Sequence, residues 1–271
     1  TIHALRVCQL KLKQHGVKRM RLVATEACRR ADNASDFIRQ VKRESGLQLE
    51  IIEPEEEARL AVISCAPLVS TKTEQLLVVD IGGGSTELVW IDLSSVPKRE
   101  RPRAIMRLHA GFHPAESPFA AAKVVDWISV PLGVATLRDQ FNDVEADSAR
   151  FALMSWFFEE NLAEFAPYRD EQPRDGFQII GTSGTVTTVA ASHLGLKRYD
   201  RTKVDGLQMT SDQIDRVINS YLALGPAGRQ LDPRIGSERQ ALIMSGSAIL
   251  QALLRCWPTE RLSVADRGLR E

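Results

Sequence analysis

The sequence lacks several features that would point to a membrane, a nucleic acid or a secreted protein. Its 271 residues contain no run of about 18 apolar residues, so no membrane-spanning helix is predicted. The 35 Lys and Arg balance 35 Asp and Glu, so no net field attracts DNA or an anionic membrane, and local groups must hold any anion. The first sixteen residues lack a continuous apolar stretch, so no signal peptide is predicted. We therefore expect a cytoplasmic protein that binds neither DNA nor a membrane.

Cysteine is also scarce, with four widely spaced residues, Cys8, Cys28, Cys65 and Cys256. The absence of a C-x-x-C pair argues against a metal site or a disulfide framework. Each cysteine stands beside apolar residues, so all four are predicted to be reduced thiols in the core. The histidines offer one H-x-x-x-H pair, His109 and His113, which we interpret as loop residues of a proline-rich stretch.

What the sequence does have is an alternation of predicted helices and strands. A helix ending at Gly16 is followed by a strand at 20–25, a helix at 33–44, a strand at 47–52 and a helix at 54–65. Further strands are predicted at 76–80, 86–91, 128–130, 177–180 and 262–265, and helices at 135–141, at 147–164 and within 211–257. Residues 94–125 carry prolines and basic clusters, and we interpret most of them as an exposed insertion. The alternation predicts an α/β fold.

Two glycine-rich turns, each after an apolar strand, are candidates for phosphate binding. They are DIGGGST at 80–86 and GTSGT at 181–185. Glycines let backbone N–H groups converge on an anion, and the neighbouring hydroxyls add donors. A tight hairpin and an ordinary strand-to-helix turn would account for the same residues, so the pattern alone leaves both interpretations open.

Two carboxylates accompany the first of these turns. Asp80 ends an apolar strand and Glu87 lies in the strand that follows, where a charge is costly without a partner. Mg²⁺ would be such a partner, because it takes only one or two protein carboxylates and keeps water and phosphate oxygens as its other ligands. A salt bridge, or an aspartate that caps its own turn, is the alternative.

An acidic run, EPEEEAR at 53–59, lies where a strand gives way to a helix. Acidic residues in the first turn of a helix usually stabilise the helix dipole, which accounts for most of them. Hydrolysis of a phosphoanhydride also needs a carboxylate near the attacking water, but spacing does not select one. Arg29, Arg267 and Arg270 follow strands and are candidates to complete an anion site, although a single arginine is more often a surface residue.

Six stretches stand out in this order: ATEACRRADNASDFI, EPEEEARLA, VVDIGGGSTELV, SVPLG, GTSGT and ADRGLRE. Together they resemble the exopolyphosphatase and guanosine pentaphosphate phosphohydrolase (Ppx/GppA) family of the actin-like phosphotransferase superfamily. DIGGGSTEL is the most specific of them, and the resemblance is interrupted mainly at 94–125. It implies a two-domain actin-like (ribonuclease H-like) fold with the active site in the interdomain cleft. It also implies Mg²⁺-dependent removal of terminal phosphate from polyphosphate or from guanosine pentaphosphate (pppGpp), an alarmone of the stringent response.

By motif, the resemblance assigns site residues. Glu57 would be the general base that activates water, and Asp80 and Glu87 would be the carboxylates linked to the metal ion. The phosphate-binding residues would be Arg29, Gly83, Gly84, Ser85, Thr86, Gly184 and Thr185. The last two belong to a loop that is similar to the nucleoside-side loop of the superfamily.

The resemblance also implies a domain organisation. Residues 1–60 would be the remnant of a first domain, 61–255 a second domain whose two glycine-rich turns open on one cleft, and 256–271 a C-terminal segment returning toward the first domain. Family members begin with a strand and a D-x-G-S-x-S turn, which is absent upstream of residue 20, and this chain starts at Thr1. We therefore expect an N-terminally truncated member with an incomplete first domain, which alone releases little or no phosphate.

Other functions stay open at this point. A degenerate module that binds phosphate or alarmone without turnover is the main alternative to a hydrolase. An actin-like sugar or acetate kinase is more distant, because EEARL at 56–60, ahead of the DIGGGST turn, favours water over an acceptor hydroxyl. The sequence does not choose between polyphosphate and pppGpp, and a homodimer remains one possibility.

Overall fold

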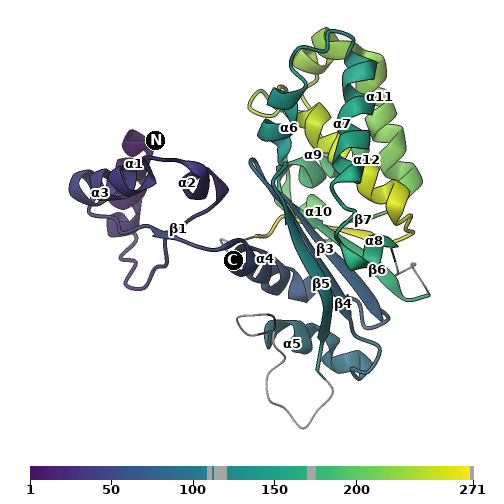
Figure 1. Ribbon diagram of the computed structural model, residues 1–271, viewed down its shortest axis with the longest axis horizontal. Helices are drawn as coiled ribbons and strands as arrows, with labels where there is room; N and C mark the ends of the chain where they lie inside the picture. The colour runs from purple at the N-terminus through teal and green to yellow at the C-terminus, as the bar shows by residue number, and fades with distance from the viewer. Residues whose placement is uncertain (109–111, 113–120, 170–174, 269–271) are drawn as a thin grey trace. The chain divides into compact units, whose positions relative to one another are not determined.

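The computed structural model describes residues 1–108, 112, 121–169 and 175–268, and the chain divides into two compact units (Figure 1). The first unit is Thr1–Glu57 and the second is Ala58–Glu271. The resemblance placed a division between residues 60 and 61. Each unit has its own secondary structure and its own buried side chains.

The first unit is a small α/β arrangement with few buried apolar side chains. Its elements are α1 (Ile2–Gln14), β1 (Val23–Ala24), α2 (Glu26–Arg30), α3 (Ala34–Ser45) and β2 (Glu50–Ile51), followed by the start of α4 (Pro54–Cys65). The two short strands pair in parallel. Helix α3 is capped by Gly46, whose φ of 72° is a left-handed conformation that glycine adopts at little cost. The buried apolar residues are Val41, Leu47 and Ile52.

Helix α1 shows that the prediction of four core thiols was wrong. None of its residues is buried, and Cys8 is exposed. Cys65 is buried, as predicted, whereas Cys28 and Cys256 are partly exposed. The amphipathic pattern predicted the helix correctly, but an apolar stripe is buried only where a partner surface covers it.

The second unit is built on a six-stranded mixed sheet. The strand order is β5 (Lys123–Val130), β4 (Thr86–Asp92), β3 (Gln75–Ile81), β6 (Phe177–Thr182), β8 (Leu262–Ala265) and β7 (Gln208–Met209). Strands β3, β6 and β8 are parallel to one another, whereas β4, β5 and β7 run antiparallel to their neighbours. The strands predicted at 76–80 and 86–91 are confirmed, and they pair as the antiparallel hairpin β3–β4. The C-terminal segment at 256–271 contributes β8 to this sheet.

Helices cover both faces of this sheet (Figure 1). They are α5 (Arg101–Met106), α6 (Val134–Gln140), α7 (Asp147–Glu160), α8 (Ala166–Arg169), α9 (Gly184–His193), α10 (Arg201–Val204), α11 (Ser211–Leu231) and α12 (Ile243–Cys256), besides the rest of α4. Leu77 and Val79 of β3 belong to a core that includes side chains of α7, α9, α11 and α12. Leu76 and Val78 belong to a second core with side chains of α4 and α5. A strand covered on both faces is apolar throughout, which explains the uninterrupted LLVV of β3.

The described part of the stretch 94–125, residues 94–108, 112 and 121–125, is not simply the exposed insertion that its prolines and basic residues suggested. Helix α5 lies within it, and Ile105 of that helix is fully buried in the second core. Arg101 is also buried, and its guanidinium donates to two backbone carbonyl groups, which offsets the cost of burying a charge. The predicted loop residues His109 and His113 lie outside the described residues.

The helix α11 is 21 residues long and is interrupted at Gly225, which has a φ of 65°, just before Pro226. It buries one side against α9 and α12 and exposes the other. None of the helices in the described part of the chain combines the length and the hydrophobicity that crossing a membrane requires.

Candidate functional site

The two glycine-rich turns line one cavity in the second unit. Strand β3 ends at Ile81 and helix α9 begins at Gly184. Because β3 and β6 are neighbouring parallel strands, their carboxyl ends meet at the same edge of the sheet. The cavity has a volume of about 310 Å³. It is lined by Ile81, Gly82, Gly83, Val134, Ser183, Gly184, Thr185, Arg239, Leu242 and Ile243.

The turn between β3 and β4, residues 82–85, presents backbone N–H groups. The Gly82 N–H donates to the Ser85 carbonyl at 2.9 Å, and a Cβ at Gly82 would lie 2.8 Å from that oxygen, so the turn requires glycine here. Within the described residues, the N–H groups of Gly83, Gly84 and Ser85 donate no hydrogen bond. Successive N–H groups in such a turn form a concavity that suits a phosphate.

The hydroxyl groups near this turn are used within the protein. Ser85 Oγ donates to Glu87 Oε1 at 2.6 Å, and the fully buried Thr86 donates to the Leu132 carbonyl at 2.7 Å. The resemblance assigned Ser85 and Thr86 to phosphate binding. In this geometry their hydroxyls fix the turn, so the donors that the turn could offer to an anion are its backbone N–H groups.

Asp80 and Glu87 lie directly opposite each other on the antiparallel strands β3 and β4. Directly opposed residues project to the same face with Cβ atoms about 5 Å apart, so two carboxylates there repel each other when both are ionised. Glu87 is only 2% exposed, and its Oε1 also accepts a hydrogen bond from Ser129 of β5 at 2.9 Å. A cation bound beside this pair would offset the repulsion.

Magnesium suits this pair better than a metal that needs a cage of protein ligands. Across the described residues, no group of three or more His, Cys, Asp or Glu side chains is arranged to hold a metal ion. Mg²⁺ needs only one or two carboxylates, since water and phosphate oxygens complete its octahedron. Asp80 is more exposed than Glu87 and is the better placed of the two to offer an oxygen.

Ser183 connects the turn before α9 to the end of β3. Its φ of 86° and ψ of 179° lie in a region that is essentially restricted to glycine. Its Oγ donates to the carbonyl of Ile81 at 2.6 Å. A side chain keeps such a conformation only where its surroundings enforce it. The sequence pattern predicts only a hydroxyl donor in a glycine-rich turn here and does not reveal this contact, because no spacing pattern marks a strained residue.

Arg239 was also missed, and it lies over the first turn of α9. One of its guanidinium nitrogens donates to the Gly184 carbonyl and to the hydroxyls of Thr187 at 3.0 Å and Thr188 at 2.7 Å. A Cβ at Gly184 would lie 3.2 Å from this guanidinium group, so glycine makes room for it. Arg239 also lines the cavity and so adds a positive charge there. Nothing in its local sequence distinguishes it from a surface arginine.

Arg267 is held by a carboxylate rather than left for an anion. Its guanidinium makes two close contacts to Asp205 Oδ2, at 2.7 and 3.0 Å. Its carbonyl accepts a hydrogen bond from Thr182, at the end of β6. Arg267 therefore fastens the chain that follows β8, and Arg270 lies outside the described residues.

In the first unit, Arg29 and Glu57 form an ion pair that is largely shielded from solvent. Arg29 Nη2 lies 2.8 Å from Glu57 Oε2 and 3.1 Å from Glu26, and Nη1 donates to the Ile52 carbonyl at 2.7 Å. Burial lowers the pKa of Arg29, but its hydrogen bonds and ion pairs with Glu57 and Glu26 outweigh that effect and raise the pKa. The structure thus brings together two residues that the resemblance assigned to the site.

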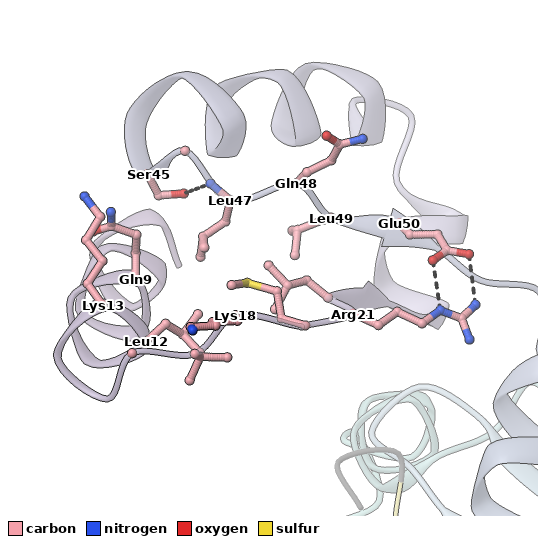
Figure 2. A pocket seen from close by; sticks show the side chains of 15 residues that line it. Gln9, Leu12, Lys13, Lys18, Arg21, Ser45, Leu47, Gln48, Leu49 and Glu50 are labelled. Atoms are coloured by element: carbon pink, nitrogen blue, oxygen red, sulfur yellow. Dashed lines mark hydrogen bonds and ion pairs between the residues drawn. The ribbon is translucent and has the colours of Figure 1, made fainter.

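A wider cavity, of about 1010 Å³, also lies in the first unit. Figure 2 shows Leu12, Leu47 and Leu49 around it, with the ion pair of Arg21 and Glu50 at one end. This cavity contains neither a glycine-rich turn like DIGGGST nor a pair of opposed carboxylates. It therefore lacks the features that suit the cavity of the second unit to phosphate.

A family model described as the Ppx/GppA phosphatase family matches residues 1–271. The chain belongs to this family. A guanosine-5'-triphosphate,3'-diphosphate pyrophosphatase from Aeromonas salmonicida is 27% identical over 267 residues, which cover 98% of this chain and 46% of that protein. The chain therefore spans about half the length of the curated relatives it matches.

Solved structures of Ppx/GppA proteins share the fold. The Aquifex aeolicus member of the family is 30% identical, with a TM-score of 0.73 over 99% of this chain and 77% of that one. An exopolyphosphatase from Cytophaga hutchinsonii, 20% identical, has a TM-score of 0.78 over 98% of this chain and 77% of that one, and it bears on the fold alone. These likenesses confirm the predicted actin-like α/β fold.

Proposed function

We propose that this Ppx/GppA protein is a phosphoanhydride hydrolase that removes terminal phosphate from pppGpp or polyphosphate. The observation that carries the proposal is the cavity where the β3–β4 turn meets the start of α9, beside two opposed carboxylates. The names of the curated relatives, guanosine-5'-triphosphate,3'-diphosphate pyrophosphatases, support a substrate of this class.

Backbone groups are the main phosphate ligands in this proposal. The N–H groups of Gly83, Gly84 and Ser85 would bind oxygens from one side, and the first turn of α9, at Gly184 and Thr185, from the other. Donors that are fixed before the substrate binds lower the barrier, because they need not reorient as charge moves in the transition state. Loss of one such donor commonly costs about 10² to 10³ in rate.

Mg²⁺ is the proposed cofactor, with Asp80 and Glu87 as its carboxylates. The ion would neutralise charge on the phosphate oxygens. The two residues face each other across β3 and β4, so a bound cation would also relieve their repulsion. The buried Glu87 additionally holds Ser85 and thereby the β3–β4 turn.

Glu57 is the proposed general base. It would take a proton from water as the water oxygen bonds to the terminal phosphorus and the bridging P–O bond breaks, its electron pair leaving with the shortened chain. Arg29 donates to Oε2 of this carboxylate, which fixes its orientation, and no bond to Oε1 is made within the described residues. Arg29 also remains a proposed phosphate ligand, because a guanidinium has five N–H donors.

The test measures phosphate release by the protein expressed from its whole reading frame, with pppGpp and polyphosphate as separate substrates. Release from at least one of them is expected. Asp80→Asn should raise the Mg²⁺ concentration needed for half-maximal release by about tenfold or more, since a metal site is weakened when a supporting carboxylate is lost. The matched control is Asp212→Asn, the same exchange at an exposed position of α11, which should leave the requirement unchanged.

Three other outcomes each reject part of the proposal. Release with an unchanged Mg²⁺ requirement in Asp80→Asn would remove Asp80 from the metal site. Binding of both substrates without release would support the binding module that the sequence left as an alternative. Neither binding nor release would contradict the proposed substrate class.

A further inference from the structure

The first turn of α6 bonds to the β3–β4 turn through the backbone. The first N–H groups of an α-helix have no partner within the helix, so they need acceptors elsewhere. Val134 N–H donates to the carbonyl of Gly82 at 2.9 Å, and Ala135 N–H donates to that of Gly83 at 2.9 Å. Two otherwise unpaired donors of α6 are thus satisfied by the glycine turn.

Thr136 adds a side-chain contact to the same turn. Its hydroxyl accepts a hydrogen bond from Gly133 N–H at 2.8 Å, and its one proton is shared between the Gly84 carbonyl at 3.2 Å and the Gly133 carbonyl at 3.3 Å. In a trans peptide, the C=O group and the N–H group of the next residue point in opposite directions. Because three successive carbonyls of the turn point to α6, the N–H groups of Gly83, Gly84 and Ser85 point away from it.

Gly133 permits this close approach. A Cβ at this position would lie 2.5 Å from the carbonyl oxygen of Gly82 and 2.6 Å from that of Gly83. Its φ of −111° and ψ of −174° are extended values that any residue can adopt. The need for glycine therefore comes from the neighbouring turn and not from the conformation of Gly133 itself.

Helix α6 is itself held from two directions. Thr86 of β4 donates to the Leu132 carbonyl at 2.7 Å, and Ser245 of α12 donates to the Val134 carbonyl at 2.6 Å. Leu137 of α6 is fully buried in the core of the second unit. The donors of α6 are therefore in place before any ligand arrives.

We infer that Gly133 and Thr136 are positioning residues for phosphate binding. They do not touch the substrate in this scheme: α6 fixes the carbonyl groups of the β3–β4 turn and so aims its N–H groups at the anion. The inference rests on the proposed function, because it assigns a role to residues that support the same cavity. Orienting donors in advance is the general way in which such turns gain affinity and rate.

The first test compares Thr136→Val with Thr136→Ser. Valine keeps the shape but loses the hydroxyl, whereas serine keeps the hydroxyl. Loss of one hydrogen bond should weaken binding of Mg²⁺–tripolyphosphate, measured by calorimetry, by about 3- to 10-fold in Thr136→Val. Thr136→Ser should bind like the wild type, and Gly133→Ala should bind more weakly than Thr136→Val. Wild-type affinity in a folded Thr136→Val would overturn the inference.

The second test does not depend on any activity. The amides of Val134 and Ala135 should exchange with solvent more slowly than unprotected amides by about tenfold or more, although first-turn amides ordinarily exchange quickly. Gly133→Ala should remove this protection, and fast exchange in the wild type would overturn the inference. If these amides are protected but the wild type does not bind tripolyphosphate, the result contradicts the proposed function. The contact between α6 and the β3–β4 turn would then have a structural role only.

Discussion

At the scale of single residues, Ser183 shows how the site depends on a local conformation that the fold enforces. Its backbone conformation costs about 1–3 kcal/mol for a residue other than glycine. Its hydrogen bond to the Ile81 carbonyl contributes about 1 kcal/mol. The serine therefore stabilises the junction of the two turns by its hydroxyl and destabilises it by its Cβ.

Replacing Ser183 should separate these two effects. Ser183→Ala loses the hydrogen bond and keeps the strain, so the free energy of unfolding should fall by about 1–2 kcal/mol. Ser183→Gly also loses the bond but relieves the strain, so it should be more stable than Ser183→Ala by about 1 kcal/mol. Urea unfolding followed by tryptophan fluorescence measures this, since all four tryptophans lie in the second unit. Equal stabilities for the two variants would show that Ser183 is not strained.

At the scale of elements, the sequence predicted those that have a strong local pattern. Helix α4 begins at Pro54, as expected from proline in a first turn, and β8 has the bounds that its apolar run predicted. The two-residue strand β7 has no periodicity to detect. Helix α5 was misread because Pro102 and the neighbouring arginines have the composition of a loop, while the burial of Ile105 depends on tertiary packing.

In the candidate site, too, the sequence predicted the residues that have a local pattern and missed those that depend on tertiary contacts. The glycine-rich turns and the carboxylates at positions 80 and 87 have a local sequence pattern, and the structure brings both turns to one cavity. Ser183 and Arg239 act through contacts made only after folding. Gly133 belongs to SVPLG, a stretch that resembles the family, but its role depends on a carbonyl about 50 residues away in the chain, which no local pattern reveals.

The pairing of β1 with β2 has an electrostatic component. Arg21 lies 2.9 Å from Glu50 and 2.7 Å from Glu56. The hydrogen bond from Arg21 lowers the pKa of Glu50 from its ordinary value of 4.5. A carboxyl group whose pKa is lowered by folding stabilises the fold above that ordinary value, and the stabilisation is lost as the pH falls through the lowered pKa.

We therefore expect the amide of Ile52, which donates to the Ala24 carbonyl between these strands, to lose protection as the pH falls below 4.5. Glu50→Gln should weaken this pH dependence. Hydrogen exchange expressed as protection factors measures it, because the intrinsic pH dependence of exchange then cancels. Asp36→Asn, at an exposed ion pair of α3, is the matched control. The same pH profile in Glu50→Gln and wild type would exclude the contribution of this pair.

At the scale of the whole molecule, the proposed chemistry draws on residues from both compact units. The second unit supplies the phosphate-binding turns and the carboxylates of β3 and β4. The first unit supplies Glu57, held by Arg29. The family model matches residues 1–271, so both units carry residues that the resemblance assigns to the site.

The most direct test of the central claim is phosphate release by Glu57→Gln in the protein expressed from its whole reading frame. Glutamine keeps the size of the side chain but cannot take a proton, so release should fall by about 10² or more while binding of Mg²⁺–tripolyphosphate is largely retained. Glu56→Gln is the matched control, because this neighbouring glutamate pairs with Arg21, and it should release phosphate at nearly the wild-type rate. Equal release by Glu57→Gln and the wild type would contradict the account of Glu57 as the base that activates water.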